Sequence, residues 1–180
     1  MTWCFEPGLA RSTGLGPVLG LVARRVRTAW SHLNDRDIEF VLRMFAPTFT
    51  HRFVGQNAMG GVRDNIDSQR RWFERLFRLL TDIRFTVDDV LVKGWPWRTR
   101  VVALLRTSGS VAGHPFNNEF AQTIELRWGQ ITRVNVVEDT EKMATILGHL
   151  IECGVEEASA PQITDRPDPR DLDNHLPNPR

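Results

Sequence analysis

Residues 116–147 read FNNEFAQTIELRWGQITRVNVVEDTEKMATIL and predict two strands, a tight turn and a helix. Apolar and polar residues alternate on both sides of a turn at 128–130, which is typical of a hairpin with one buried face. Apolar residues then recur every three to four positions, which favours a helix, and Asp139 or Thr140 can cap its first turn. Such a hairpin can form the wall of a pocket. The side chains on its inner face should therefore decide whether the protein can carry out acid–base catalysis.

The chain before this hairpin predicts three helices and three further strands. Apolar spacing marks a first helix over 18–33, and Asp37 can cap a second one that includes Phe45 and ends at Pro47. Asp64 or Asn65 can cap a third, whose apolar stripe runs to residue 80. The strands are expected at residues 48–54, 82–93, 97–107, 116–128 and 130–138, with a loop at 55–61.

This order of elements predicts an α+β fold, in which helices pack on one face of a curved antiparallel sheet. Residues 17–154 form one domain in this interpretation, after an irregular arm at 1–16. Residues 155–180 are rich in proline and are expected to be an extended or disordered tail. The cavity beneath the helices is the expected place for a small ligand.

Composition narrows the function classes. The net charge of +1 gives no reason to expect nucleic acid or a membrane as a partner, and no segment is apolar and long enough to span a bilayer. Cys4 and Cys153 make no metal or redox pattern, so a reduced cytoplasmic protein is expected, although a disulfide between them stays open. No metal or other cofactor is expected.

Several short motifs resemble the nuclear transport factor 2-like superfamily, which includes ketosteroid isomerase and the SnoaL-like polyketide cyclases. They are LNDRD at 33–37, FVG at 53–55, MGG at 59–61, RWGQI at 127–131 and EDT at 138–140. The resemblance covers residues 18–151 approximately. It implies a cone-shaped α+β barrel, with three helices of the N-terminal half packed over the curved sheet and a C-terminal helix. It specifies activity poorly, because one fold hosts many chemistries.

The catalytic residues that the resemblance implies are mostly absent. The isomerases' helix tyrosine aligns with Ala29, their general base with Arg52, and their second acid with Ile124. The acid of the cyclases and of the similar limonene epoxide hydrolases aligns with Val136, while Asp139 is retained. Proton transfer needs a carboxylate of tuned pKa near the substrate. Isomerisation by the usual mechanism is therefore not expected.

Arg52 is the leading candidate for a functional residue, on the expectation that its side chain points into the cavity. Its guanidinium can bind a carboxylate, phosphate or enolate oxygen, or it can be a structural partner of Glu138 or another acid. Glu138 can be a base of raised pKa or a plain strand-end acid. The catalytic residues stay unknown, with Arg52 and Glu138 as weak candidates. His51 is expected to point away from the cavity, opposite to Arg52.

The predicted ligand-binding residues are Arg52, Trp30, Asn118, Gln122 and Glu138. Strand alternation places Asn118 and Gln122 on the inner face of the hairpin, where their amides can orient a carbonyl or bind neighbouring backbone. Trp30 can stack on a flat ligand or pack in the core.

Two functions stay open at this point. One is an enzyme of the isomerase, cyclase or hydrolase type that acts on a small apolar or carbonyl-containing molecule. The other is a non-catalytic ligand-binding or dimerisation module of the same fold. A homodimer is expected, because apolar residues such as Val102, Leu104 and Ala121 should lie on the outer face of the sheet.

Overall fold

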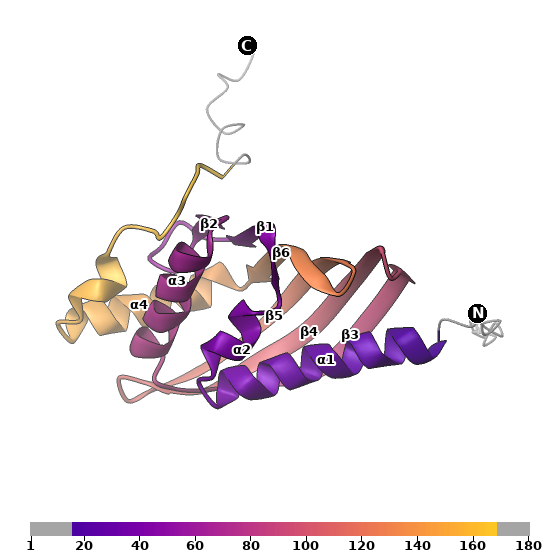
Figure 1. Ribbon diagram of the computed structural model, residues 1–180. Coiled ribbons are helices and arrows are strands. Elements are labelled where there is room, and N and C mark those ends of the chain that lie inside the picture. The colour runs from indigo at the N-terminus through magenta and orange to yellow at the C-terminus, as the bar shows by residue number, and fades with distance from the viewer. Residues whose placement is uncertain (1–15, 169–180) are drawn as a thin grey trace, which may run out of the picture.

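The computed structural model describes residues 16–168, and their elements follow the expected order with two additions (Figure 1). The helices are α1 (Gly16–Asn34), α2 (Ile38–Leu42), α3 (Ile66–Leu79) and α4 (Thr140–Glu152). The strands are β1 (Phe45–Phe53), β2 (Gly61–Arg63), β3 (Asp82–Trp95), β4 (Arg98–Val111), β5 (His114–Arg127) and β6 (Gln130–Glu138). The additions are the short strand β2 and the 3-10 helix η1 (Glu156–Ser159).

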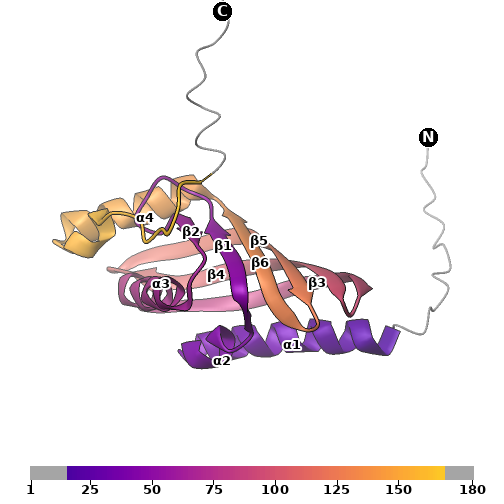
Figure 2. The same cartoon turned by 45° about the horizontal axis from the view of Figure 1, so that its top comes forward.

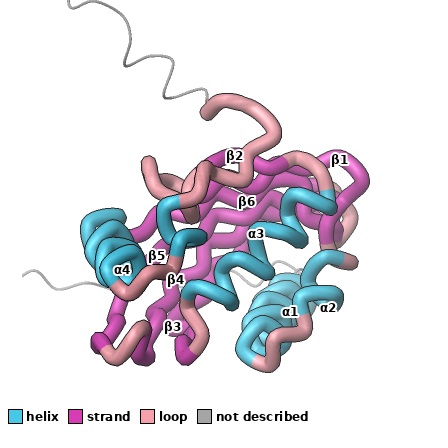
Figure 3. Tube along the Cα trace, turned by 90° about the vertical axis from the view of Figure 1, so that its left-hand side faces the viewer, coloured by secondary structure: helices cyan, strands magenta, loops and turns pink. Residues whose placement is uncertain are grey.

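The strands form one curved sheet in the order β2-β1-β6-β5-β4-β3. Figure 3 shows α1 and α3 on its hollow side and α4 near one end of the strands. The predicted α+β class and the helix-covered curved sheet are confirmed, and the sheet is not closed. One pair differs from the expected antiparallel pattern, because β1 and β6 are parallel. Parallel neighbours need a long connection, and here the connection contains α3 and four strands.

The turn between β5 and β6 is a two-residue loop, as the sequence predicts. Arg127 pairs with Gln130, and the two residues between them, Trp128 and Gly129, have φ angles of 51° and 78°. Two consecutive positive φ angles define the hairpin turn whose twist matches that of the strands. The turn sets the pairing at the tip, and a bulge between the Leu126–Ile131 and Glu125–Arg133 pairs then places Val134, Val136 and Glu138 on the inner face.

The second helix is shorter than predicted. It ends at Leu42, and Phe45 begins β1, where it pairs with Ile131 of β6. Pro47 lies inside β1, at the irregularity between the Phe45 and Thr50 pairs. Proline cannot donate to a sheet ladder, and such an irregularity is one of the few strand positions that tolerate it.

The three predicted helix caps are present. The Asp37 side chain accepts a hydrogen bond from the backbone N–H of Phe40 in α2. The Asn65 side chain accepts hydrogen bonds from the backbone N–H groups of Asp67 and Ser68 at the start of α3. Asp139 accepts from the two N–H groups of Glu141 and Lys142 at the start of α4. Each cap satisfies helix donors that have no partner within the helix.

Residues 160–168, called here the C-terminal strap, run in extended form after η1 and bind along β2. Thr164 donates to and accepts from the backbone of Val62, and Asp165 accepts from the N–H of Asp64 at 2.8 Å. This described part of the predicted tail is extended and held by long-range hydrogen bonds. Of the predicted arm at 1–16, residue 16 begins α1, and residues 1–15 lie outside the described residues, as does the tail beyond residue 168.

Candidate functional site

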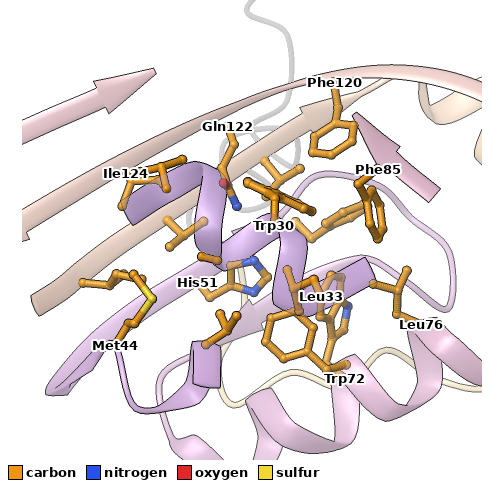
Figure 4. A pocket seen from close by; sticks show the side chains of 18 of the residues that line it. Trp30, Leu33, Met44, His51, Trp72, Leu76, Phe85, Phe120, Gln122 and Ile124 are labelled. Atoms are coloured by element: carbon orange, nitrogen blue, oxygen red, sulfur yellow. The ribbon is translucent and has the colours of Figure 1, made fainter. Parts of the chain in front are cut away.

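A largely apolar cavity lies between the curved sheet and the helices that cover it (Figure 4). Its volume is about 120 Å³, several times the roughly 10–15 Å³ that one water molecule needs. Side chains of α1, α3, β1, β5 and β6 contribute most of its lining. Among them are the aromatic residues Trp30, Phe53, Trp72, Phe85 and Phe120. Such a chamber fits a small apolar molecule.

Few polar side chains line this cavity. Those described there are His51 on β1, Thr107 on β4, Gln122 on β5, Glu138 at the end of β6 and Arg25 on α1. Arg25 is exposed and lies beside Gly129, so it belongs to the rim. The inner polar groups are therefore one imidazole, one hydroxyl, one amide and one carboxyl.

Glu138 is the carboxyl group within this lining. Its Oε2 atom accepts a hydrogen bond from the Asn118 amide at 3.1 Å, while its buried Oε1 atom has no partner among the described residues. Burial and, to a lesser extent, the charge of Asp139 raise the pKa of Glu138 to about 8. At neutral pH Glu138 is therefore protonated. A protonated carboxyl group in an apolar cavity can donate a hydrogen bond or a proton to an oxygen atom.

His51 points into the cavity from β1 and is 3% exposed (Figure 4). The buried Arg63 donates from Nε to its Nδ1 at 3.3 Å. Burial and then the Arg63 charge lower the pKa of His51 well below 6.5, so the ring is neutral at pH 7. Since Nδ1 accepts a hydrogen bond, the hydrogen of the neutral ring is on Nε2. His51 therefore acts as a donor and not as a base.

Arg63 holds this wall of the cavity together. It is fully buried, and besides His51 it donates to the carbonyls of Gly60 at 3.0 Å, Gly61 at 2.9 Å and Ile163 at 3.1 Å. Burial lowers the pKa of Arg63 to about 9, so it stays charged at neutral pH. The guanidinium also lies over the Trp72 ring, 4.9 Å from its centroid. Arg63 fixes the tautomer of His51 and attaches the C-terminal strap.

The predicted direction of the Arg52 side chain is wrong. In the second half of β1 the buried residues are Phe49, His51 and Phe53, so Arg52 points to the opposite side. Arg52 Nε donates to Asp168 at 2.5 Å, and Nη1 donates to Asn135 at 3.0 Å. Because side chains alternate along a strand, taking Arg52 as inward exchanged the two faces. Arg52 thus has the acidic partner that the structural alternative expected, although the partner is Asp168 and not Glu138.

The other predicted ligand-binding residues lie at or beside the cavity. Trp30, Gln122 and Glu138 line it, and the Gln122 amide points toward Trp30 and His51 in Figure 4. Asn118 is buried behind Glu138, where it binds that carboxyl group and the Asp139 carbonyl. The structure therefore brings four of the five together and places Arg52 elsewhere.

Sequence reasoning missed two residues of the site, His51 and Arg63. The signal for His51 was present, because Phe49, His51 and Phe53 share one strand face and two of them are large and apolar. The burial of Arg63 had no local signal, since its partner Ile163 is 100 residues away in the chain.

Two positions that the resemblance assigns to catalytic acids, Ile124 and Val136, are buried apolar residues that line the cavity. Ala29 on α1, which aligns with the isomerases' tyrosine, lines it as well. The alignment therefore places these three positions correctly at the cavity.

Residues 26–134 match the family model of the SnoaL-like domain. That match spans more than half of the chain. The chain belongs to the SnoaL-like family. The family lies within the nuclear transport factor 2-like superfamily that the motifs indicate. A comparison with curated proteins gives no significant match to this SnoaL-like protein.

Solved structures show the same fold at low sequence identity. Bal32a from a soil-derived mobile gene cassette is 16% identical with a TM-score of 0.59, over 67% of this chain and 90% of that chain. A putative isomerase from Bacillus subtilis is 13% identical with a TM-score of 0.58, over 72% and 94% of the two chains. TerC, co-crystallised with polyporic acid, is 20% identical with a TM-score of 0.55, over 71% and 95%. These likenesses establish the fold alone.

The described residues contain neither a metal-ion cluster nor a membrane-spanning helix. Within residues 16–168, no group of three or more His, Cys, Asp and Glu side chains is placed to hold a metal ion. No helix in that part of the SnoaL-like protein is long and apolar enough to cross a membrane.

Proposed function

We propose that this SnoaL-like protein binds a small, neutral, largely apolar molecule that carries an oxygen acceptor such as a carbonyl. The observation that carries the proposal is Glu138, a protonated carboxyl group in an apolar cavity, whose Oε1 atom has no partner within residues 16–168. A buried polar atom without a partner is costly, and a ligand oxygen would relieve that cost. TerC, which shares the fold, was crystallised with polyporic acid.

The neighbouring residues have distinct roles in this proposal. Asn118 holds Oε2 of Glu138 and so directs the carboxyl group. Besides the Glu138 carboxyl group, the Gln122 amide can bind the ligand, and Trp30 provides a flat apolar surface beside it. Arg52 has no role in this cavity, because it does not line it.

A matched pair of probes tests the proposal. 2-Acetylnaphthalene and 2-ethylnaphthalene have similar shapes, but only the ketone has an oxygen acceptor. We expect the ketone to bind about tenfold more tightly, the value of one hydrogen bond to a buried donor. Glu138→Gln keeps an amide donor and should keep this preference, whereas Glu138→Leu should lose it. Glu119→Leu, at an exposed position of β5, is the control. Equal binding of both probes by the wild-type protein would reject the proposal.

Catalysis is a second proposal, supported by the pKa of Glu138. A carboxyl group with a pKa of about 8 can both donate and accept a proton near neutral pH, as isomerase, cyclase or hydrolase chemistry requires. Deuterium incorporation next to the carbonyl of bound 2-acetylnaphthalene in D2O, read by mass spectrometry, would support an enzyme if Glu138→Gln abolished it. Binding of the ketone without exchange would favour the non-catalytic module. The apolar Ile124 and Val136 favour that alternative.

We also infer a homodimer in a reducing, cytoplasmic compartment. Leu104 and Val137 on the outer face of the sheet are 43% and 46% exposed, and their apolar surface is suited to a partner. Cys153 is a free and exposed thiol, which is typical of a reducing environment. Sedimentation equilibrium of wild type and Leu104→Glu tests the dimer, and a monomeric wild type would contradict it.

A further inference from the structure

Three tryptophans gather at the tips of two hairpins, far from the core. Trp95, Trp97 and Trp128 are 52%, 52% and 74% exposed. The Trp95 and Trp97 rings stack with centroids 5.3 Å apart, and Trp128 lies 6.2 Å from Trp97. A backbone hydrogen bond of 2.8 Å from Trp128 to Pro96 joins the two tips. This cluster, called here the tryptophan tip, is a contiguous apolar surface that the cavity does not use.

Cations surround the tryptophan tip. Lys93, Arg98, Arg100 and Arg127 are all exposed on the strand ends that carry it. An acidic residue on these strand ends is Glu125, whose Oε1 atom lies 3.6 Å from Nη2 of Arg100. The net charge of +1 for the whole chain therefore conceals a strongly positive end. This end of the molecule can therefore attract an anionic membrane in spite of the small net charge of the chain.

The first turns of α1 extend toward the same end. At the C-terminus of α1 the Asn34 side chain forms hydrogen bonds with the backbone of Phe85, near the start of β3. About two turns earlier in α1, Arg27 donates a hydrogen bond to the carbonyl of Val87, further along β3. The helix therefore runs antiparallel to β3, and its N-terminal half lies beside the hairpin tips in Figures 1 and 2. Leu21 on this half is 64% exposed. Arg24 and Arg25 are also exposed there, so α1 adds apolar and basic groups to the same surface.

The rim of the cavity lies at this end too. Val22 and Arg25 of α1 and Gly129 of the β5–β6 turn line it, and Gly129 directly follows Trp128. A molecule that enters between α1 and this turn therefore passes the tryptophan tip.

We propose that the tryptophan tip and the N-terminal half of α1 dock on an anionic lipid surface, with the cavity rim facing the lipid. Tryptophan favours the membrane–water interface, and each exposed Lys or Arg adds about 1 kcal/mol of attraction to anionic headgroups. Apolar surface and basic charge together are the composition of interfacial anchors. A single-stranded nucleic acid is less well matched, because Trp95 and Trp97 stack on each other and Leu21 offers no stacking face. This docking is independent of which ligand the cavity binds.

Co-sedimentation with sucrose-loaded vesicles tests the proposal. We expect the full chain to bind vesicles that contain phosphatidylglycerol, to bind pure phosphatidylcholine weakly, and to dissociate as the salt concentration rises. The triple variant Trp95→Ser/Trp97→Ser/Trp128→Ser should bind about tenfold more weakly at unchanged thermal stability, since these side chains are exposed. Arg98→Glu/Arg127→Glu should weaken binding to the anionic vesicles alone. Ile151→Ser removes an exposed apolar side chain of α4 and should bind like the wild type.

Several outcomes would overturn the proposal. It is wrong if the wild-type protein does not sediment with anionic vesicles, or if the triple variant sediments with them as well as the wild type does. If the triple variant binds vesicles like the wild type but is a monomer in sedimentation equilibrium where the wild type is a dimer, the surface contacts a second copy of the chain. Tryptophan-dependent binding of poly(U) without vesicle binding would assign it to nucleic acid. Vesicle binding does not need an occupied cavity, so its failure would leave the probe-binding result of the cavity unchanged.

Discussion

The two walls of the cavity each bury a titratable side chain, but with opposite acid–base character. On the β1–β2 wall, His51 is a histidine whose pKa is lowered well below 6.5. On the β5–β6 wall, Glu138 is an acid whose pKa is raised to about 8. In both cases burial is the largest cause, because a low-dielectric environment penalises the charged form. At neutral pH both groups facing the cavity are therefore uncharged.

The walls differ in how their polar atoms are satisfied. His51 has a hydrogen bond from Arg63, which itself binds three backbone carbonyls. Glu138 has one bond from Asn118 and one oxygen atom without a partner among the described residues. Arg63 ties the first wall together, whereas the second wall leaves one carboxyl oxygen without a partner among the described residues. The comparison therefore assigns scaffolding to Arg63 and His51 and ligand contact to Glu138.

Removing Arg63 should disrupt the first wall and have the largest effect. Arg63→Met keeps much of the side-chain volume but leaves three buried carbonyls and His51 Nδ1 without donors. We expect the free energy of unfolding to fall by about 3–5 kcal/mol in urea denaturation. Arg78→Met, which removes a mostly exposed partner of Glu157, should cost less than about 1 kcal/mol. Similar losses in the two variants would show that the burial of Arg63 contributes little.

Changing Glu138 should alter how stability depends on pH. In the unfolded chain Glu138 loses its proton near its ordinary pKa of 4.5, but in the folded protein it keeps the proton to about pH 8. Between these values the folded state binds more protons, so the free energy of unfolding falls as pH rises, by at most about 1.4 kcal/mol per pH unit. This contribution is complete below pH 4.5 and lost above pH 8.

Glu138→Gln cannot ionise and should lack that slope. Relative to the wild type, the variant should become steadily more stable from pH 5 to pH 8 in a series of urea denaturations, and the difference should level off above the pKa of about 8. Glu119→Gln on the exposed face of β5 is the matched control and should follow the wild type. A constant difference between Glu138→Gln and the wild type would mean that Glu138 ionises normally.

The same comparison shows what the sequence can predict. The β5–β6 wall has long alternating strands, so the inward positions of Gln122 and Glu138 follow from the pattern once Ile124 and Val136 are taken as inward. The bulge next to the turn, which interrupts the alternation between Ile131 and Val134, leaves no such signal. On β1 the residues 50–53 read THRF, a short segment in which the pattern is weak. There the family alignment chose the wrong face for Arg52. A one-residue error exchanges all inward and outward side chains of a strand.

Long-range contacts account for the rest of what was missed. Arg63 belongs to a three-residue strand and binds Ile163 of the C-terminal strap, 100 positions later. The partner of Arg52 is Asp168, 116 positions later. Neither pairing leaves a local periodicity, because each depends on how a proline-rich segment folds back on β1 and β2. The parallel pairing of β1 with β6 also joins segments far apart in the chain and leaves no local pattern in the sequence.

His51 should produce a pH dependence of opposite sign. Its folded pKa lies well below 6.5, so below pH 6.5 the unfolded chain binds the additional proton. Stability should therefore fall as pH drops below 6.5, again by at most about 1.4 kcal/mol per pH unit. His51→Gln keeps an acceptor for Arg63 and should remove this loss in denaturation measured from pH 7 down to pH 5. The exposed His114→Gln is the control. An unchanged acid slope in His51→Gln would mean that His51 is protonated in the fold.

Arg52 provides the smallest effect and the sharpest test of which β1 side chain faces the ligand. Arg52→Met breaks the ion pair with Asp168 and the bond to Asn135, both outside the cavity. We expect the free energy of unfolding to fall by about 1–2 kcal/mol, because both side chains of the ion pair are mostly buried. Affinity for 2-acetylnaphthalene, measured by titration calorimetry, should stay within about twofold of the wild type, since no ligand contact is lost. Asp168→Asn weakens the same pair from the other side and should likewise leave probe affinity unchanged. A tenfold loss of affinity in Arg52→Met, with Asp168→Asn unaffected, would return Arg52 to the ligand site and reverse the assignment of the two faces of β1.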